Sequence, residues 1–239
     1  MTLVIAHRGA SAYAPENTMP AFELAVHQGA DMVEFDVQRS SDGVLVVFHD
    51  DTTERWDGKK RLMTDCTFAE LQQISIRGAR IPRLAEVCSY AREQHLRMNV
   101  ELKQVGIGAD VALLLREERV EDLVLISSFA RQALAEAELS CPHIPRGYLM
   151  GNNTLRPTVR FRESWPLLAL KEANAQAWHP THQIPFVMRV IPVVRRAGYK
   201  VHVWTVNDQA VLRRLVDIDV DGIITDMPDV LRRMIQAKD

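Results

Sequence analysis

The sequence contains few cysteines and no surplus of basic residues. Its three cysteines, Cys66, Cys88 and Cys141, are odd in number and lack the paired spacing of a metal site. We therefore expect reduced thiols, as in a cytoplasmic protein. The formal net charge of −2 gives no support for nucleic-acid binding, because domains that bind nucleic acids normally carry a basic surplus.

Long hydrophobic runs are also missing. No run reaches the roughly 18 apolar residues of a membrane span. The segment from Thr2 to Ala6 is too short for the hydrophobic core of a signal peptide. We therefore expect a cytoplasmic protein, monomeric or homodimeric, with no stable membrane anchor.

Residues 32–50 read as two β-strands joined by a tight turn at Asp42-Gly43, because glycine accepts a positive φ without steric cost. Apolar residues alternate along the first strand with Glu34 and Asp36, which places both carboxylates on one face. If the chain folds back at the turn, His49 returns close to Glu34.

Two carboxylates on one strand face repel each other unless protons or a cation neutralise them. A hard divalent cation such as Mg²⁺ or Ca²⁺ would bind them through oxygen. The alternative interpretation is a solvated strand face with ordinary surface acids.

The 239 residues, of which 47% are hydrophobic and 25% charged, suffice for a substantial core. Strands are expected at residues 3–6, 33–38, 44–48, 97–102, 123–127, 145–150, 176–179, 200–206 and 222–225. Helices are expected at 18–28, 68–74, 84–95, 109–119, 131–139, 155–162, 186–197 and 208–216, and from residue 228 onward. The polar stretch 51–82 is long for a loop and suggests a small insertion or lid near a site.

Without one arm of the hairpin, eight strands alternate with helices. This rhythm is typical of a closed (β/α)₈ or TIM barrel, and we expect one such domain over residues 1–239. A doubly wound open sheet is the alternative. Its nucleotide-binding versions are disfavoured, because no G-x-G-x-x-G or G-x-x-x-x-G-K-S/T follows the first strand.

Polar and aromatic side chains recur at the predicted carboxyl ends of the strands, where such a barrel forms its sites. They are His7, Arg8, Glu34, Asp36, His49, Asp50, Glu101, Lys103, Phe129, Trp204 and Asp226. A lone histidine is more often structural, and a lone Glu-x-Lys is usually a surface ion pair. Convergence of so many on one rim is improbable by chance.

The same residues belong to a series of short motifs. In order they are His7-Arg8-Gly9, Pro15-Glu16-Asn17-Thr18, Glu34-Phe35-Asp36-Val37, Asp42-Gly43 before His49-Asp50, Asn99-Val100-Glu101-Leu102-Lys103, Ser128-Phe129, Trp204-Thr205-Val206-Asn207 and Gly222-Ile223-Ile224-Thr225-Asp226. The ordered set resembles the glycerophosphodiester phosphodiesterase family, in particular its short bacterial cytoplasmic members. The resemblance covers nearly the whole chain and implies a TIM barrel with a metal-dependent site.

The resemblance also implies roles for individual residues. Glu34, Asp36 and Glu101 would hold a divalent cation, either Mg²⁺, Ca²⁺ or Mn²⁺. His7 and His49 would form a general acid/base pair, which suits imidazoles because they titrate near neutral pH.

The remaining groups would bind the substrate. Arg8 and Lys103 would bind phosphate oxygens, and Phe129 and Trp204 would line the glycerol or leaving-group side. A cation, a guanidinium and an ammonium match the negative charge that grows on a phosphodiester in its transition state.

The implied reaction is hydrolysis of glycerophosphodiesters, such as glycerophosphocholine or glycerophosphoethanolamine, to glycerol 3-phosphate and an alcohol. One histidine would deprotonate the glycerol 2-hydroxyl or a water that attacks phosphorus, and the other would protonate the leaving alcohol. The sequence does not say which histidine is the base.

Several other polar residues have more than one interpretation. His27 and His95 are expected on helix surfaces, whereas His179 and His182 could be structural or lie at the rim. Glu16 could reach the site, and Asp226 could orient its neighbours or touch substrate. Residues 55–58, Arg-Trp-Asp-Gly, stand where the family has an Arg-Thr-Thr-like segment, and their role stays open.

Two other functions are compatible with these motifs. One is a related phosphodiesterase, such as a phosphoinositide phospholipase or a sphingomyelinase-like lyase. The other is a phosphate-binding barrel that has lost catalysis, against which the presence of both histidines and all three carboxylates argues.

Overall fold

The structure, a computed structural model, describes residues 1–151 and 165–238. Its sheet has nine strands, of which all but β3 run parallel. They are β1 (Leu3–His7), β2 (Met32–Arg39), β3 (Leu45–Val47), β4 (Arg97–Leu102), β5 (Val124–Ser128), β6 (Arg146–Met150), β7 (Ala177–Pro180), β8 (Lys200–Val203) and β9 (Gly222–Thr225). Because β1 pairs with both β2 and β9, the sheet closes into the predicted barrel.

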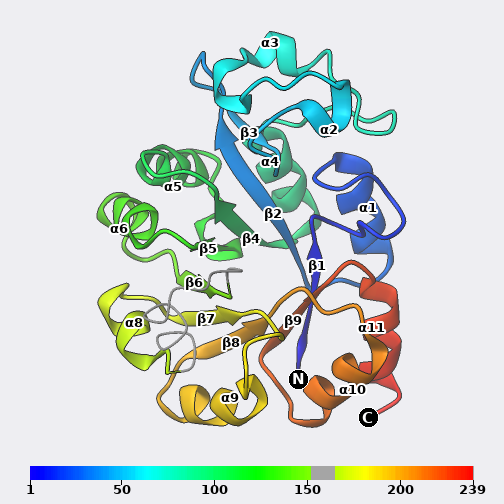
Figure 1. Ribbon diagram of the computed structural model, residues 1–239, viewed down its shortest axis with the longest axis vertical. Coiled ribbons are helices and arrows are strands. Elements are labelled where there is room, and N and C mark those ends of the chain that lie inside the picture. Colours follow the sequence, from blue (N-terminus) through cyan, green and yellow to red (C-terminus); the bar gives the residue numbers. More distant parts are fainter. Residues whose placement is uncertain (152–164, 239) are drawn as a thin grey trace.

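Helices surround the closed sheet (Figure 1). The long ones are α1 (Met19–His27), α4 (Leu84–Gln94), α5 (Gly108–Glu117), α6 (Arg131–Ser140), α9 (Val187–Arg196), α10 (Gln209–Asp217) and α11 (Pro228–Gln236). The short elements are α2 (Glu54–Asp57), η1 (Met63–Asp65), α3 (Phe68–Leu71), η2 (Glu121–Leu123) and α8 (Leu167–Glu172).

Most predicted elements are confirmed within a residue or two, and the exceptions are short. The strand expected at 200–206 ends at Val203, after which Trp204 makes only an isolated bridge to Thr181. Helix α8 was missed because its six residues are mostly an apolar run without a helical period. The helix expected at 155–162 lies outside the described residues.

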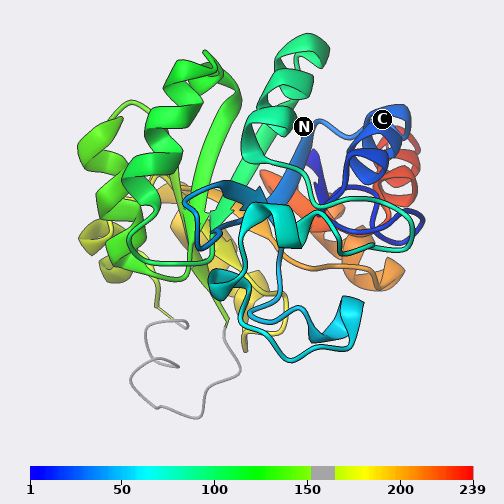
Figure 2. The ribbon, with the colours of Figure 1, turned by 90° about the horizontal axis from the view of Figure 1, so that it is seen from above.

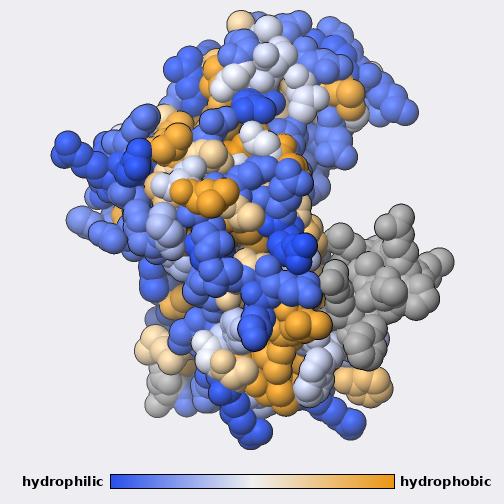
Figure 3. Space-filling model, turned by 90° about the vertical axis from the view of Figure 1, so that its left-hand side faces the viewer, coloured by the Kyte–Doolittle hydropathy of each residue, from blue (hydrophilic) through white to orange (hydrophobic). Residues whose placement is uncertain are grey.

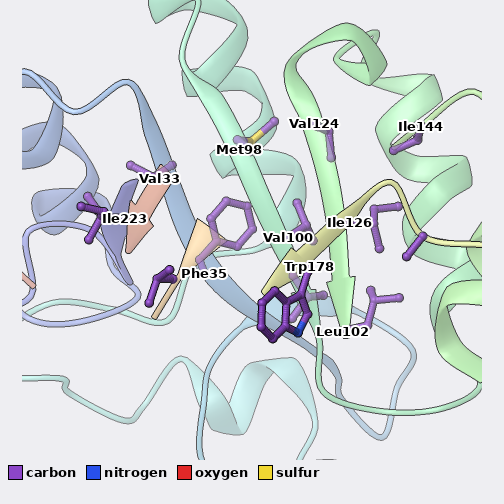
Figure 4. Close-up of a cluster of buried hydrophobic side chains, with 14 of the residues drawn as sticks. Val33, Phe35, Met98, Val100, Leu102, Val124, Ile126, Ile144, Trp178 and Ile223 are labelled. Carbon is purple, nitrogen blue, oxygen red and sulfur yellow. The ribbon is translucent and has the colours of Figure 1, made fainter. Parts of the chain in front are cut away.

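The alternation along β2 divides its side chains between the barrel interior and the main core. Val33 and Phe35 point outward, and the Phe35 ring lies 5.5 Å from that of Phe22 on α1. Figure 4 shows them beside other buried side chains, including Met98, Val100, Leu102, Ile126 and Trp178. Outward packing of the apolar positions turns Glu34 and Asp36 into the barrel.

The hairpin formed by β2 and β3 is antiparallel, with Val37 opposite Val47. The turn is made by Gly43, which has φ 87°. As the sequence predicted, this pairing returns His49 to the end of the barrel that carries the acidic side chains of β2.

The insertion that follows β3 differs from the expected polar stretch, because it has a hydrophobic core of its own. Its buried side chains, together with those of β3, are Val46, Phe48, Met63, Cys66, Leu71, Ile74, Ile76 and Ile81. In Figure 1 the insertion, in cyan, lies at the top of the molecule beyond β3, and Figure 2 shows it from above, in front of the barrel. It begins directly after His49 and Asp50, so it leaves the barrel at the rim that carries these residues.

All three cysteines are free and buried, which confirms the prediction of unpaired thiols. Burial raises the pKa of Cys66 and Cys141, and it raises the pKa of Cys88 to about 12. A buried thiol that is not ionised is a poor nucleophile. We therefore expect the native protein to give no fast reaction with Ellman's reagent, and the protein unfolded in guanidinium chloride to give three equivalents. Fast modification of even one thiol in the native protein would contradict the described burial.

None of the helices described is long and apolar enough to cross a bilayer. On the face that carries α5, α6 and α8, hydrophobic side chains lie in separate groups among hydrophilic ones (Figure 3).

Candidate active site

A cavity of about 240 Å³ lies at the carboxyl ends of the strands. Eight of its lining residues were predicted as site residues, namely His7, Arg8, Glu34, His49, Glu101, Lys103, Phe129 and Trp204. The ninth predicted residue, Asp36, is 1% exposed and contacts Arg8 and Lys103 beside the cavity. The structure thus brings all nine residues together, although their individual roles stay predictions.

The acidic cluster consists of Glu34, Asp36 and Glu101. One carboxylate oxygen from each lies within 4.8 Å of the others. Asp36 stands opposite Glu101 in the pairing of β2 with β4, which explains why carboxylates far apart in the chain meet. Asp36 also has Asn17 as a partner, whose amide donates to Asp36 Oδ2 at 2.9 Å and whose Oδ1 accepts the Asp36 backbone N–H.

Crowding of buried carboxylates changes their protonation. Burial, followed by the charges of Asp36 and Glu101, raises the pKa of Glu34 well above its ordinary value. Burial and the charge of Asp36 raise the pKa of Glu101 to about 7. Burial acts in the same direction on Asp36, but Arg8 and Lys103 outweigh it and keep the pKa of Asp36 low. The cluster therefore holds protons unless a cation replaces them.

The donor set fits a hard divalent cation. Three carboxylates supply oxygen ligands of the kind that Mg²⁺, Ca²⁺ and Mn²⁺ prefer. The amide of Asn99, which also lines the cavity, is buried and neither of its polar atoms has a protein hydrogen-bond partner. It offers a further oxygen on the same side of the cavity.

Two cations flank the acidic cluster. Arg8 Nε lies 3.1 Å from Asp36 Oδ2, and Lys103 Nζ lies 3.4 Å from Asp36 Oδ1 and 3.2 Å from Glu101 Oε1. With all groups ionised, the three carboxylates exceed the two cations by one negative charge. A divalent cation and a phosphodiester monoanion together add one positive charge, so the loaded site would be neutral.

The turn after β1 sets the position of Arg8. Arg8 itself has a left-handed φ of 54°, and its backbone N–H donates to Glu34 Oε2 at 3.1 Å. Gly9 follows with φ 84°, and a Cβ there would lie 2.6 Å from the backbone of Ala21. Only glycine fits this close approach to α1, which explains the Gly of the His-Arg-Gly motif.

His7 is oriented by a carboxylate from the other end of the chain. Its Nδ1 lies 2.6 Å from Asp226 Oδ1, and its Nε2 lies 4.0 Å from Glu34 Oε2. Ser11 and Asn207 also donate to Asp226. Burial would raise the pKa of Asp226, but the hydrogen bond and charge of His7, with those other donors, lower it to about 2.

His49 has a partner of its own in Asp50. His49 Nδ1 lies 2.8 Å from Asp50 Oδ1, and Gln38 holds the backbone of this segment by donating to the Asp50 carbonyl at 3.0 Å. Burial outweighs the nearby charge of Asp36 and lowers the pKa of His49 below its ordinary value. A neutral His49 is therefore favoured at pH 7.

Phe129 and Trp204 form the apolar wall of the cavity. Their rings meet edge to face, with centroids 5.6 Å apart. The Trp204 indole N–H donates to the carbonyl of His179 at 2.8 Å, which fixes the ring at the mouth. The wall can therefore pack against a small organic group without competing for hydrogen bonds.

The other histidines, whose roles the sequence left open, lie outside the lining of the cavity. His179 lies inside the barrel, fully buried, with its ring 4.8 Å from that of His202, and it does not line the cavity. Burial lowers the pKa of both, that of His202 to about 4. His182 is not a lining residue, whereas His27 and His95 are exposed on helix ends as expected.

Sequence reasoning missed several supporting residues. Asn17 holds Asp36, a role that the sequence did not predict, while Thr18 is the N-cap residue of α1 and its hydroxyl donates to the Pro15 carbonyl. The position of Asn17 between Glu16 and the helix gave no independent signal. Asn207, named only as part of the Trp204-Thr205-Val206-Asn207 motif, and Ser11 both donate to Asp226, a role that the sequence did not predict.

Three comparisons place this architecture among known proteins. The family model described as "Glycerophosphoryl diester phosphodiesterase family" matches residues 7–230. A glycerophosphodiester phosphodiesterase of Caldanaerobacter subterraneus is 33% identical over 252 residues, which covers 98% of each chain. A glycerophosphodiester phosphodiesterase of Bacillus altitudinis is 34% identical over 244 residues, which covers 96% of each.

The fold comparison agrees with the sequence comparisons. A phosphodiesterase of Oleispira antarctica, solved in complex with the product sn-glycerol-3-phosphate, superposes with a TM-score of 0.84. It is 30% identical, and the alignment covers 97% of this chain and 96% of that one.

Proposed function

This chain belongs to the glycerophosphoryl diester phosphodiesterase family, and on that premise we propose that it hydrolyses glycerophosphodiesters to glycerol 3-phosphate and an alcohol. Glycerophosphocholine and glycerophosphoethanolamine are the substrates we expect. The observation that carries the proposal is the convergence of three carboxylates, two imidazoles, a guanidinium and an ammonium around one cavity.

The phosphate would lie between the two cations and the acidic cluster. Arg8 can donate two parallel hydrogen bonds to phosphate oxygens, and Lys103 acts as a point charge. Both are already held by Asp36, so little conformational entropy is lost when substrate binds. Phe129 and Trp204 would contact the glycerol or the leaving alcohol.

Glu34, Asp36 and Glu101 would hold the divalent cation, with Mg²⁺, Ca²⁺ and Mn²⁺ as candidates. When bound, it supplies a Lewis acid that stabilises negative charge on the phosphoryl oxygens. The low pKa of Asp36 keeps one carboxylate ionised in advance, which favours binding of a cation over binding of protons.

We assign the two proton transfers on the basis of the residue that holds each histidine. His49 is favoured in its neutral form, and with Nδ1 held by Asp50 its Nε2 is left to accept the proton of the attacking hydroxyl. His7, oriented through Nδ1 by Asp226, would donate a proton to the alcohol as its bond to phosphorus breaks. The attacking hydroxyl is that of water, which gives glycerol 3-phosphate directly, or the glycerol 2-hydroxyl, which gives a cyclic phosphate that a water must then open to yield glycerol 3-phosphate.

The proposal is tested by incubating the purified protein with glycerophosphocholine, glycerophosphoethanolamine, an intact phospholipid and a lysophospholipid, each with Mg²⁺, Ca²⁺ or Mn²⁺. We expect glycerol 3-phosphate from the first two, no turnover of the intact lipid, and none of any substrate after chelation with EDTA. Turnover of intact lipid alone would favour a phospholipase. No turnover with any metal would favour a phosphate-binding barrel without catalysis.

Replacing Asp226 with asparagine is expected to lower kcat by roughly 100-fold, since misplacement of a reacting group by about an ångström has an effect of that size. The substitution keeps the shape of the side chain but weakens its hold on His7 Nδ1. KM is expected to change little, because Asp226 does not contact the predicted phosphate-binding residues. Asp229→Asn on α11 is the control, since Asp229 pairs with Tyr13 and Arg233 instead. An unchanged kcat in D226N would remove Asp226 from the mechanism.

We also infer that residues 1–239 act as one domain. The support for this is the pairing of β1 with β9, which joins the two ends of the chain in one sheet. The hydrophobic core of the insertion includes Val46 of β3 and is therefore joined to the same sheet.

A further inference from the structure

Arg55 is the residue of the insertion that reaches the rim of the site. It belongs to α2 and binds two carboxylates from different segments of the chain. Its Nη1 donates to Glu16 Oε2 at 3.1 Å, and Nη2 also binds Glu16. Its Nε donates to Asp50 Oδ2 at 2.6 Å, and Nη2 lies 3.0 Å from Asp50 Oδ1.

Each of these carboxylates holds a predicted site residue on its other side. Glu16 Oε1 accepts a hydrogen bond from Arg8 Nη1 at 2.9 Å. Asp50 Oδ1 binds His49 Nδ1 at 2.8 Å. Arg55 therefore connects the guanidinium expected to bind phosphate with the imidazole expected to move a proton.

An exposed ion pair would normally contribute little, because two long side chains must be ordered in water. The side chain of Arg55 is 45% exposed, but its partners Glu16 and Asp50 are only 20% and 21% exposed. Its guanidinium also stacks on Trp56, 4.3 Å from the ring centroid, and Trp56 packs on the core of the insertion. The arginine is thus held in place before it binds either carboxylate.

We propose that Arg55 is a positioning residue that orients Arg8 through Glu16 and His49 through Asp50. This inference rests on the proposed function and makes the insertion part of the active site. The arm through Asp50 fixes the ring of His49 and so supports proton transfer. The arm through Glu16 fixes the guanidinium of Arg8 and so supports substrate binding.

The test compares Arg55→Met with Arg61→Met. Arg61 lies in the same insertion and pairs with Asp57 at 2.8 Å and Glu70 at 3.7 Å, but with no group at the rim. We expect R55M to lower kcat/KM by about 100-fold, since misplacement of a reacting group by an ångström has that effect. We expect R61M to stay within about twofold of the wild type. The kcat/KM of R55K should lie between those of R55M and the wild type, because lysine keeps the positive charge but lacks the planar guanidinium that binds two carboxylates.

Two further variants separate the arms. Asp50→Asn is expected mainly to lower kcat, and Glu16→Gln mainly to raise KM. Adding either substitution to R55M should lower kcat/KM by a smaller factor than the same substitution does in the wild type, because the arginine that links the two carboxylates is already gone. Fully multiplicative effects would contradict the proposed coupling.

A readout without metal or substrate keeps this inference separate from the proposed function. The ¹⁵N chemical shifts of the His49 ring report its tautomer and hydrogen bonding, and His49→Gln identifies the signals. We expect these shifts to change in R55M and not in R61M. If the wild type is inactive, the proposed function fails while the ring shifts still test the positioning. If R55M leaves both the ring shifts and kcat/KM unchanged, or if R61M matches R55M in both, Arg55 only stabilises the insertion and the inference is wrong.

Discussion

Replacing Glu101 with glutamine is expected to lower the metal-dependent turnover by about 10³-fold, because a Lewis acid at phosphorus contributes several kcal/mol to transition-state stabilisation. The same change is expected to stabilise the protein in the absence of metal at pH 8. Glutamine occupies nearly the same volume as glutamate but puts no third negative charge beside Glu34 and Asp36. Activity and metal-free stability should therefore move in opposite directions.

The pH dependence of this effect follows from the raised pKa. The pKa of Glu101 is about 7 in the folded protein against an ordinary value of 4.5. Stability that comes from a raised pKa is fully present below the ordinary value and is lost as pH rises through the folded value. The metal-free wild type should therefore lose stability between about pH 4.5 and pH 7 relative to E101Q. A divalent cation should restore that stability, and more of it at pH 8 than at pH 5.

Thermal unfolding of both proteins at pH 5 and pH 8, with EDTA or with Mg²⁺, Ca²⁺ or Mn²⁺, measures these expectations. Glu117→Gln is the matched control, because Glu117 is exposed on α5. A metal-dependent rise in melting temperature that E101Q shares with the wild type would place the ion elsewhere. Equal turnover of E101Q and E117Q would remove this carboxylate from the reaction.

Replacing either pocket histidine with glutamine is expected to lower kcat by about 10²–10⁴-fold, the usual contribution of general acid/base catalysis. The two variants should differ with an activated substrate, the p-nitrophenyl ester of glycerol 3-phosphate. Its leaving group departs as a weakly basic anion and needs no proton. H7Q should therefore recover most of its activity on this ester, while H49Q should not.

The pH dependence of kcat/KM of the wild type on the acid side provides a second test of the role of His49. A general base must be neutral, and the pKa of His49 lies below its ordinary value of 6.5. With the divalent cation saturating at every pH, we expect kcat/KM to fall with decreasing pH only below that value. His27→Gln is the control, since His27 is exposed on α1. Recovery of H49Q instead of H7Q on the nitrophenyl ester would reverse the two assignments.

The barrel could be predicted from the sequence because its strands carry local signals. The alternation around Glu34 and Asp36 set their common face, and the Asp42-Gly43 turn set the return of His49. Both depend on neighbours in the chain. The common face is confirmed by the meeting of both carboxylates with Glu101, and the hairpin by the pairing of β2 with β3. Within the insertion only α3 was predicted, because the short elements α2 and η1 depend on a shared core more than on helical period.

The supporting contacts could not be predicted in the same way, because they join residues that only the closed barrel brings together. His7 and Asp226 are 219 positions apart and meet because β1 pairs with β9. Arg55 reaches Glu16 across 39 positions because the insertion folds over the rim.

The sequence by itself determined which side chains face the barrel interior, since strand alternation is a local property of the backbone. Tertiary structure decided which carboxylate, imidazole or guanidinium each of those side chains contacts. The physical reason is that hydrogen bonds and charge pairs act over a few ångströms, and those distances are set by strand pairing and packing across the whole chain.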